Sequence, residues 1–389
     1  MHTGRSIFSQ LLDFLPKHTF DRCVARYKGN HRVRHFSCFN QFLCMAFAQL
    51  TYRDGLRDIE ICLRAMRAKL YHAGFRGDIA RSTLADANET RDWRIYADFA
   101  HALIKRARKL YANDSFGVEL KQAVYAFDST TIDLCLSLFP WARFRRRKGA
   151  IKLHTQIDLR GTIPCFIHIS NGKLHDVNLL DEIPIEAGAF YLFDRGYTDF
   201  ERLYAFTVNM AFFVIPAKSN LDYRLCAYRH VDRKSGLRSD HTIKLNGPAT
   251  QKLYPDPLRR VVFYDKVLKH RIVLLTNNFV LTALTIADLY RCRWHVEIFF
   301  KWIKQHLRIK SFFGTSFNAV RTQVWIAISV YVLVAIVKKE LRIDRNLGEI
   351  LQILSISLFE KMPIQQALAG DSKIFPNNES HNQLILFTS

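Results

Sequence analysis

Two short apolar runs, each ending on an aspartate, constrain the fold most strongly. Ala123–Phe127 and Ala189–Phe193 are rich in strand-forming residues, and they stop directly before Asp128 and Asp194. The pattern predicts two buried strands, each with a carboxylate at its C-terminal end, 66 residues apart. Ligands of open α/β sheets bind outside the carboxyl ends of the strands, so we expect a functional site there.

The segments around these runs predict the rest of a sheet. Residues 151–159 and 162–170 alternate in polarity and are expected to form a hairpin. A helix around 176–182 and a buried strand at 210–215 follow. This order indicates a mixed α/β sheet flanked by helices. Residues 217–280 are polar and turn-rich but contain strand patterns of their own, so we expect a β-rich insertion there.

The N-terminal part, residues 1–115, carries apolar side chains at three- and four-residue steps, which is typical of a helical domain. A helix at 56–63, a break at 74–78 and a second helix opened by a capping box of Thr83 and Asp86 would suit a helix-turn-helix DNA reader. Paired helices are also a common packing unit, so a plain helical hairpin stays an alternative. In the DNA-reading interpretation, the contact residues near the start of the second helix are Arg81, Ser82, Thr83, Asn88 and Arg91.

The charge of the chain favours a polyanionic partner. The formal net charge is +22 and the isoelectric point is about 9.8, with bases spread along the whole chain, which favours nucleic acid over a membrane. The eight cysteines include no CxxC pair, so we expect no zinc site. The first residues are too polar for a signal peptide, so the sequence predicts a cytoplasmic protein.

The C-terminal part, residues 321–389, is expected to be a helical region followed by a loose tail, after a central domain at 116–320. Its longest mostly apolar run, residues 324–337, spans 14 residues. A helix needs roughly 20 apolar residues to cross a bilayer. We therefore expect a buried core helix.

A single helix is expected over residues 289–304, with an unusual polar face. Tyr290, Arg293, Glu297 and Lys304 recur at helical steps and set one carboxylate among cations. Two interpretations are open: a solvated ion-pair helix, or a metal-binding carboxylate surrounded by phosphate-binding cations.

The three acids Asp128, Asp194 and Glu297 supply hard oxygen ligands that suit Mg²⁺ or Mn²⁺. Two such ions can activate an attacking hydroxyl and stabilise the leaving oxygen of a phosphodiester. The alternative is that the two aspartates merely cap the elements that follow them. The basic run at 143–148, with Arg145, Arg146 and Arg147, is either a solvated loop or a phosphate clamp beside these acids.

Three blocks of residues resemble a known family. Tyr290-x₂-Arg293-x₃-Glu297-x₆-Lys304 matches the Y-(2)-R-(3)-E-(6)-K signature of the DDE transposases of the insertion-sequence-four (IS4) family. Asp194-Arg195-Gly196-Tyr197 resembles the block around their second aspartate, and Asp128-Ser129-Thr130 resembles the first. The resemblance extends from the N-terminal helices to about residue 320.

The resemblance implies an RNase H-like catalytic core with a β-strand insertion, preceded by an all-α DNA-binding domain. It implies that Asp128, Asp194 and Glu297 are the catalytic residues and hold the metal, two Mg²⁺ or Mn²⁺ ions in the family's pattern. The DNA contacts that it implies are Tyr290, Arg293 and Lys304, and Lys218 resembles a DNA-contacting lysine of the family. Arg195, next to the second aspartate, and the loop residues Arg145, Arg146 and Arg147 are further candidate DNA contacts.

The family's activity is cut-and-paste DNA transposition in a bacterial or archaeal cell, by a dimer bound to the terminal inverted repeats. Related enzymes form a DNA hairpin and hold a flipped base on an insertion-domain tryptophan, but residues 195–293 contain no tryptophan. The aromatic residues that remain for that role are Tyr223, Tyr228, Tyr254, Phe263 and Tyr264. Two alternatives are a DNA-binding protein with a silent nuclease and a metal-dependent nuclease without strand transfer.

Overall fold

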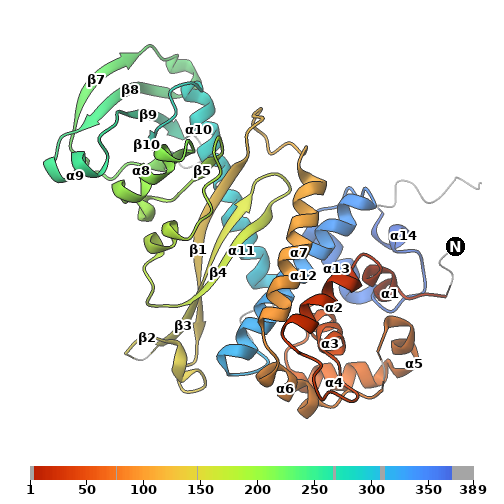
Figure 1. The fold of residues 1–389 in the computed structure, drawn as a ribbon. Helices are drawn as coiled ribbons and strands as arrows, with labels where there is room; N and C mark the ends of the chain where they lie inside the picture. Colours follow the sequence, from red (N-terminus) through yellow and green to blue (C-terminus); the bar gives the residue numbers. More distant parts are fainter. Residues whose placement is uncertain (1–3, 76, 147, 266–268, 307–311, 370–389) are drawn as a thin grey trace, which may run out of the picture.

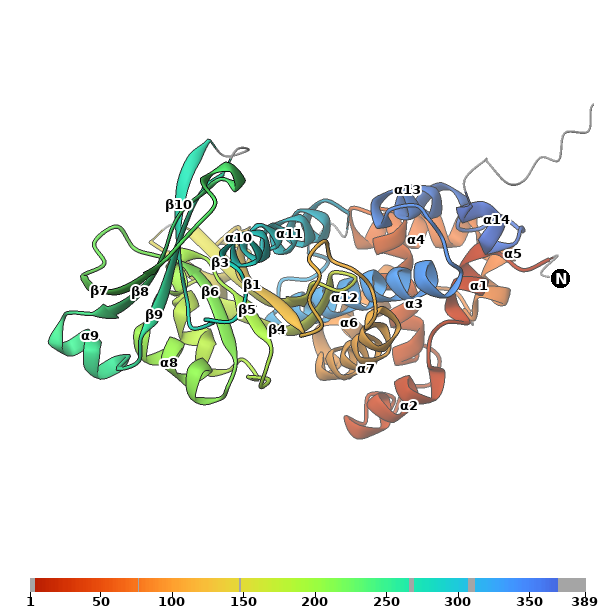
Figure 2. The same cartoon turned by 90° about the horizontal axis from the view of Figure 1, so that it is seen from above.

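The computed structural model describes residues 4–75, 77–146, 148–265, 269–306 and 312–369. A helical region at one end adjoins a ten-stranded sheet that extends to the other end, and long helices run between them (Figures 1 and 2). The N-terminal helices are α1 Ile7–Leu12, α2 Lys17–Arg26, α3 Cys38–Leu50, α4 Leu56–Ala65, α5 Arg67–Leu70, α6 Arg81–Thr90 and α7 Arg94–Tyr111.

Helix α12, Phe317–Glu340, lies at the centre of the helical region and packs against α3, α6 and α7. It is apolar on all sides, so it must be surrounded by protein or lipid. Of the helices that the structure describes, it alone is long and apolar enough to cross a membrane, but 94% of its apolar window is buried inside the protein. The expectation of a buried core helix is confirmed.

The C-terminal helices also belong to the helical region rather than to a separate part after residue 320. Helices α13, Leu347–Ser357, and α14, Ile364–Leu368, pack beside α1 and α3. The side chain of Gln10 in α1 donates to the carbonyl of Met362 at 2.7 Å and accepts from the backbone of Ile364 at 2.9 Å. The two ends of the described chain are thus joined in one core.

The sheet has the strand order β2-β3-β1-β5-β6-β10-β9-β8-β7, and β4 pairs with β3. Its strands are β1 Val124–Leu134, β2 Arg143–Arg145, β3 Lys148–Asp158, β4 Ile163–Asn171, β5 Phe190–Leu192, β6 Phe212–Pro216, β7 Tyr223–Arg229, β8 Leu237–Leu245, β9 Leu258–Asp265 and β10 His270–Thr276.

The central part has the RNase H-like arrangement that was expected. Strands β1, β3 and β4 form an antiparallel meander, and β5 and β6 add to β1 in parallel. The insertion follows as the antiparallel strands β7 to β10, and β10 pairs directly with β6. The insertion therefore extends the central sheet instead of forming a detached domain.

Helices cover the two faces of this sheet differently, as Figure 2 shows. Helices α10, Ala283–Cys292, and α11, Trp294–His306, lie on one face, which we call the α11 face. Helices α8, Phe200–Val208, and α9, Pro248–Leu253, lie on the other, which we call the α8 face. Alternate residues of a strand point to opposite faces, so each strand contributes to both cores.

Two expected elements differ from the structure. Strand β1 does not end at Asp128 but continues to Leu134, because β3 pairs with it along its whole length. The helix expected over 289–304 is divided at Arg293, where two consecutive turns close through i→i−3 hydrogen bonds of 3.1 Å. Such tight turns are a 3₁₀ feature and interrupt the α-helical pattern.

Candidate active site

Asp128 lies inside β1, and Asp194 follows the end of β5, the strand that pairs with β1 in parallel. The parallel pairing of β1 with β5 ends at Ala126 and Leu192, and each aspartate comes two residues later on its own chain segment. Asp128 lies two residues after Ala126 on the same strand, so the two side chains point to the same face of the sheet. The side chain of Ala126 packs in the core under α10 and α11. The two carboxylates therefore stand at the end of the parallel strands, on the α11 face.

Glu297 reaches the same place from the first turn of α11, which packs on β1. The positive end of the helix dipole favours a carboxylate in that turn. Arg293 joins this acid to the first aspartate: its guanidinium donates to Glu297 Oε1 at 2.7 Å and to Asp128 Oδ2 at 3.2 Å. The Arg293 side chain is only 13% exposed, so it lies between the two acids rather than out in solvent.

The three acids also act on one another electrostatically. Burial raises the pKa of Asp128 to about 6, with a further contribution from the charges of Asp194 and Glu297 and against the lowering effects of the Ser129 N–H and of Arg293. A carboxyl group whose ionisation is opposed by two other acids marks a concentration of negative charge. The sequence reasoning placed these acids in one site, and the geometry is compatible with that placement.

Neither aspartate merely caps the element that follows it. Asp128 lies inside β1, where its Oδ1 accepts a hydrogen bond from the N–H of Ser129 at 2.8 Å. Asp194 occupies the N-cap position of the 3₁₀ helix Arg195–Tyr197, but its side chain makes no capping hydrogen bond. The oxygens of Asp194 are therefore available for another partner.

The donor chemistry of the site fits a hard divalent cation. Three carboxylates converge, and their burial and mutual repulsion oppose their ionisation. A bound cation offsets both effects. Within the described residues, no group of three His, Cys, Asp or Glu side chains is already arranged to hold a metal ion. In this arrangement the guanidinium of Arg293 bridges Asp128 and Glu297.

The remaining signature residues lie around these acids. Tyr290 is half-buried, with the guanidinium of Arg293 5.8 Å from its ring centre, and burial raises the pKa of its hydroxyl. Lys304 donates to the carbonyl of Thr131 on β1 at 3.0 Å, three residues beyond Asp128. Two signature residues thus contact β1, Arg293 at Asp128 and Lys304 at Thr131.

Two further basic residues lie near the segment that follows Asp194. Lys218 is exposed just after β6 and donates to the carbonyl of Thr198 at 3.2 Å. Arg195 is exposed directly after Asp194, and its charge acts on Tyr290. Cations therefore flank the acid cluster from β6, from the segment after β5 and from α11.

The basic loop does not lie beside the acids, so of its two interpretations the phosphate clamp at the acids is not supported. Arg145 ends β2 and Arg146 follows in a turn, and both are exposed. This hairpin pairs with β3 opposite the far end of β1, six residues beyond Asp128, which is about 20 Å along an extended strand. The length of β1 causes the separation. Arg147 lies outside the described residues.

The second helix of the expected helix-turn-helix begins earlier than the sequence indicated. Helix α6 starts at Arg81 and its N-cap residue makes no side-chain bond, so the capping box of Thr83 and Asp86 is wrong. Arg81, Ser82 and Thr83 are exposed on its first turn. Asn88, in contrast, is buried and accepts a hydrogen bond from Gln41 at 2.8 Å, so it packs the core instead of facing a ligand.

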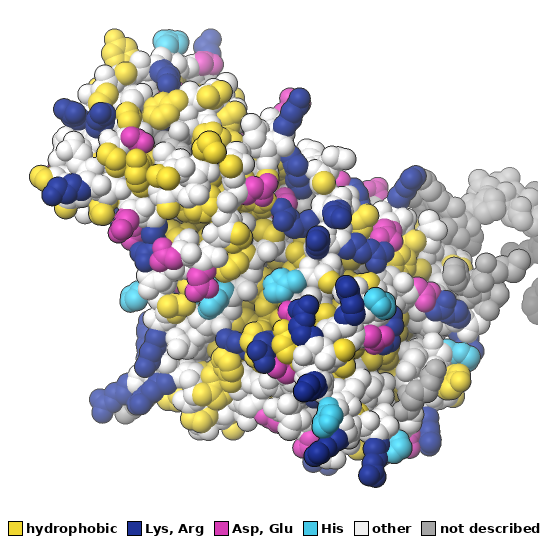
Figure 3. Space-filling view, in the orientation of Figure 1, with side chains coloured by type: hydrophobic (Ala, Val, Ile, Leu, Met, Phe, Trp, Pro, Cys, Tyr) yellow, Lys and Arg dark blue, Asp and Glu magenta, His cyan; other side chains and the backbone are white. Residues whose placement is uncertain are grey.

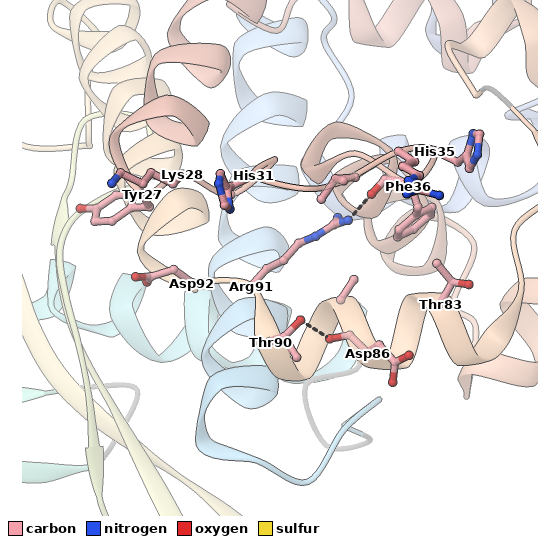
Figure 4. A pocket seen from close by; sticks show the side chains of 14 residues that line it. Tyr27, Lys28, His31, His35, Phe36, Thr83, Asp86, Thr90, Arg91 and Asp92 are labelled. Atoms are coloured by element: carbon pink, nitrogen blue, oxygen red, sulfur yellow. Dashed lines mark hydrogen bonds between the residues drawn. The ribbon is translucent and has the colours of Figure 1, made fainter.

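A pocket of about 710 Å³ opens between α6 and the segment of residues 27–36 (Figure 4). Lys28, His31 and His35 line it from that segment, and Thr83 lines it from the helix. Arg91 points across the pocket to the backbone of Phe36, and its other amino group donates to the carbonyl of Ser37 at 2.8 Å. Arg91 therefore fixes the fold of the segment, and the remaining bases line the opening.

Sequence reasoning missed two features of functional interest. One is the position of Arg293 between two acids, because spacing along a helix does not show which residue turns into the sheet. The other is a second basic pocket on the insertion, lined by arginines that lie far apart in sequence. Only the pairing of β8, β9 and β10 brings those arginines together.

Comparison with known proteins agrees with the geometry. The family model described as "Transposase DDE domain" matches residues 119–333, and a domain of unknown function (DUF4372) matches residues 3–76. The predicted transposase y4zB of Sinorhizobium fredii is 32% identical over 308 residues, which cover 77% of this chain and 82% of that protein.

Two further matches are also with transposases. A predicted transposase of insertion sequence element IS5377 from Geobacillus stearothermophilus is 32% identical over 208 residues, 53% of this chain and 54% of that protein. A cryo-EM structure of the piggyBac transposase synaptic complex with hairpin DNA matches with a TM-score of 0.43 and 10% identity, covering 93% of this chain and 80% of that one.

The family match spans more than half of the chain and includes all three acids of the site. Members of this family cleave DNA and transfer its strands with the help of divalent metal ions. The chain belongs to the DDE transposases.

Proposed function

We propose that Asp128, Asp194 and Glu297 are the catalytic triad with which this transposase cuts the ends of its own element and joins them to target DNA. The observation that carries the proposal is their convergence: two acids just beyond the last paired residues of β1 and β5 and a third on the first turn of α11, with one arginine bonded to two of them. Their charges act on each other through a half-buried site.

The three carboxylates would hold Mg²⁺ or Mn²⁺, two ions in the full arrangement, which supply charge stabilisation for in-line attack on a phosphodiester. The work of the chain is to position these oxygens. Strands β1 and β5 fix the two aspartates two residues beyond their last common pair, and the packing of α11 on β1 fixes Glu297. No covalent protein nucleophile is required.

Arg293 has two roles in this proposal. In the protein alone, it neutralises Asp128 and Glu297 and so keeps three acids together in a partly buried place. When DNA arrives, its guanidinium turns to a phosphate near the cleaved end, together with Tyr290 and Lys304. A bidentate donor such as arginine suits both a carboxylate and a phosphate.

The other DNA contacts follow from where basic side chains are exposed. Lys218 and Arg195 flank the acids and would hold the end being cut. Arg145 and Arg146 lie about 20 Å away along β1, so they would bind DNA further from the cut. Figure 3 shows Lys and Arg side chains spread over the face of the molecule drawn there, from the insertion to the helical region. The helical residues 1–115 would read the inverted repeats, with Arg81, Ser82 and Thr83 exposed for that purpose.

We further propose that the enzyme works by cut and paste, in the cytoplasm, as a dimer that holds both element ends. If a DNA hairpin forms, the aromatic residue that stacks on a flipped base is not Tyr254 or Phe263, which are 1% and 2% exposed. Of the other three, Tyr228 has the most exposed ring, at 79%, whereas Arg260 lies over the ring of Tyr223 and Arg238 over that of Tyr264.

The test is end-specific cleavage and strand transfer with Mg²⁺ or Mn²⁺ by the full chain and by the variants Asp128→Asn, Asp194→Asn and Glu297→Gln. Each variant is expected to bind the ends and to lose at least about a thousandfold in cleavage rate, because each removes a charged metal ligand. Asp133→Asn is the matched control, since Asp133 lies exposed on the same strand. Full cleavage by any of the three variants would refute the triad.

Two outcomes favour the alternatives. Wild-type protein that binds the ends and never cuts them, with either metal, would be a DNA-binding protein with a silent nuclease. Wild-type protein that cuts the ends and never joins them to a target would be a nuclease without strand transfer.

A further inference from the structure

A concave pocket of about 510 Å³ lies on the insertion, away from the acids. It is lined by four arginines and two tyrosines that come from β7, β8, β9, β10 and the turn before β8: Arg233, Arg238, Arg260, Arg271, Tyr223 and Tyr264. His241 and Ser239 complete the lining, and no Asp or Glu is among the residues that line it. Its size is in the range of ordinary ligand pockets.

The positive charge of this pocket is not neutralised by the protein. Within the described part of the chain, none of the four arginines forms an ion pair with a carboxylate, whereas the neighbouring Arg259 forms two hydrogen bonds with Asp240. Burial lowers the pKa of Arg260, and the charge of Arg271 lowers it further, so the two cations repel each other. An anion placed between them would remove that repulsion.

The tyrosines hold the guanidinium groups in place. Arg260 lies over the ring of Tyr223 at 5.3 Å, and Arg238 lies over the ring of Tyr264 at 5.9 Å. A guanidinium stacked on an aromatic face keeps its N–H groups free at its edge. Those edges are the donors that bind phosphate oxygens in pairs. The pocket is thus organised for an anion before one binds.

The pocket is on the opposite side of the sheet from the acids. Arg260 pairs with His241 on β8 and with Leu275 on β10, and Leu275 packs in the core beneath α8. The acids stand on the α11 face of the same sheet. One straight segment of DNA held at the acids therefore does not pass through this pocket.

We propose that this arginine pocket binds the backbone phosphates of DNA at a second place, on the α8 face of the insertion. The proposal rests on the assignment of the chain to a family that acts on DNA and is independent of which residues cut. DNA is favoured over a small anion because the four guanidiniums are distributed over three adjacent strands and a turn, as a run of phosphates requires.

The test measures how the full-length protein binds a fluorescent 30-base-pair duplex that lacks the element's ends, by anisotropy, over a range of salt concentrations. The variant is Arg260→Gln/Arg271→Gln. Its binding is expected to weaken, and the slope of log K against log[salt] is expected to fall by about 2, one for each phosphate that the variant no longer neutralises. A second variant, Arg233→Gln/Arg238→Gln, removes exposed charges only and tests the same pocket if the first variant folds poorly.

The matched control is Arg224→Gln/Lys244→Gln. These residues pair with each other on β7 and β8, and their side chains point to the other face of the same two strands. The proposal predicts a smaller change of slope for this control than for either pocket variant. Equal slopes for all three variants, or wild-type binding by both pocket variants, would overturn it.

A competition experiment shows whether the pocket binds DNA or a small anion. Pyrophosphate at millimolar concentration is expected to compete weakly with the duplex. If pyrophosphate binds the wild type and needs Arg260 and Arg271 while the duplex does not, the pocket is a small-anion site and the proposal is wrong. None of these measurements requires cleavage, so a failure of the catalytic triad would leave their outcome unchanged.

Discussion

Arg293 donates a hydrogen bond of 2.7 Å to Glu297, one helical turn later, and the same guanidinium also reaches Asp128. A tethered cation thus stands among the acids that would bind metal. A unit charge about 4 Å away contributes roughly 1 kcal/mol even at the dielectric constant of water. The ion pair therefore competes with a metal ion for the same oxygens.

This competition predicts that Arg293→Gln binds Mn²⁺ more tightly than wild type in the absence of DNA, by at least about fivefold. Electron paramagnetic resonance of free Mn²⁺ measures the affinity directly. Arg291→Gln is the matched control, because Arg291 pairs with Asp265 and Asp288 away from the acids. Unchanged or weaker Mn²⁺ binding by the Arg293 variant would show that the arginine does not block the site.

The turn between β3 and β4 depends on a glycine that touches the helical region. Gly161 has φ +73°, and a Cβ at this position would lie 2.2 Å from the ring of Tyr111 in α7. Gly161→Ala is therefore expected to lose about 1–2 kcal/mol for its left-handed backbone and roughly 1–3 kcal/mol more for the clash. Gly188→Ala is the control, with φ +80° and nothing within 4 Å of the added Cβ. Urea unfolding of both variants measures the difference, and equal losses would contradict the close contact.

A buried ion pair fastens the insertion to the segment before α10. Arg259 and Asp240 are 2% and 3% exposed, and they form hydrogen bonds of 2.9 and 2.7 Å, while Arg259 also donates to the carbonyl of Leu281 at 2.6 Å. Arg259→Met leaves the buried carboxylate of Asp240 with only Arg229, at 4.0 Å, as an ion-pair partner and is expected to cost about 3–5 kcal/mol. The double variant Arg259→Met/Asp240→Leu should recover part of that loss. A double variant less stable than Arg259→Met in thermal unfolding would speak against this account.

His154 makes the stability depend on pH. Its ring is fully buried beside Ser170, and burial lowers its pKa from 6.5 to about 4, despite the opposing charge of Asp176. Between these two pH values, His154 is protonated in the unfolded chain and neutral in the folded protein. The free energy of unfolding therefore falls as the pH drops from about 6.5 towards 4. His154→Gln should reduce that fall by up to about 3 kcal/mol. Thermal unfolding from pH 4.5 to 7.5 tests this, and parallel curves for the two proteins would contradict it.

Much of the sheet was predictable because its strands are short apolar runs with alternating faces. The hairpin of β3 and β4 lies where the sequence placed it, and the insertion strands β9 and β10 lie within the β-rich range expected at 217–280. The continuation of β1 past Asp128 was not predictable in that way. Its residues 129–131 are Ser and Thr, which look like a loop, and only the pairing with β3 makes them a strand.

The three acids could be proposed from sequence, because strand ends and helical spacing fix where a carboxylate stands. The hydrogen bonds that Arg293 makes to two of them could not be predicted in this way. Whether Arg293 faces DNA or the sheet depends on how α11 packs on β1, which lies 165 residues earlier in the chain. The separation of the basic loop from the acids likewise depends on the length of a pairing partner. The roles of the triad and of the DNA contacts stay predictions until they are measured.

Helix α12 has a consequence for the order in which the protein can be made. Helices α3, α6 and α7 pack against a helix that the ribosome does not finish until residue 340, after the whole sheet has been synthesised. We therefore expect a fragment of residues 1–115 to show little stable helix by circular dichroism and to gain it when α12 is supplied as a peptide. A chain that stops early would then lack both the ability to cut DNA and a folded helical region to occupy the element's ends, so incomplete copies would not compete with complete ones.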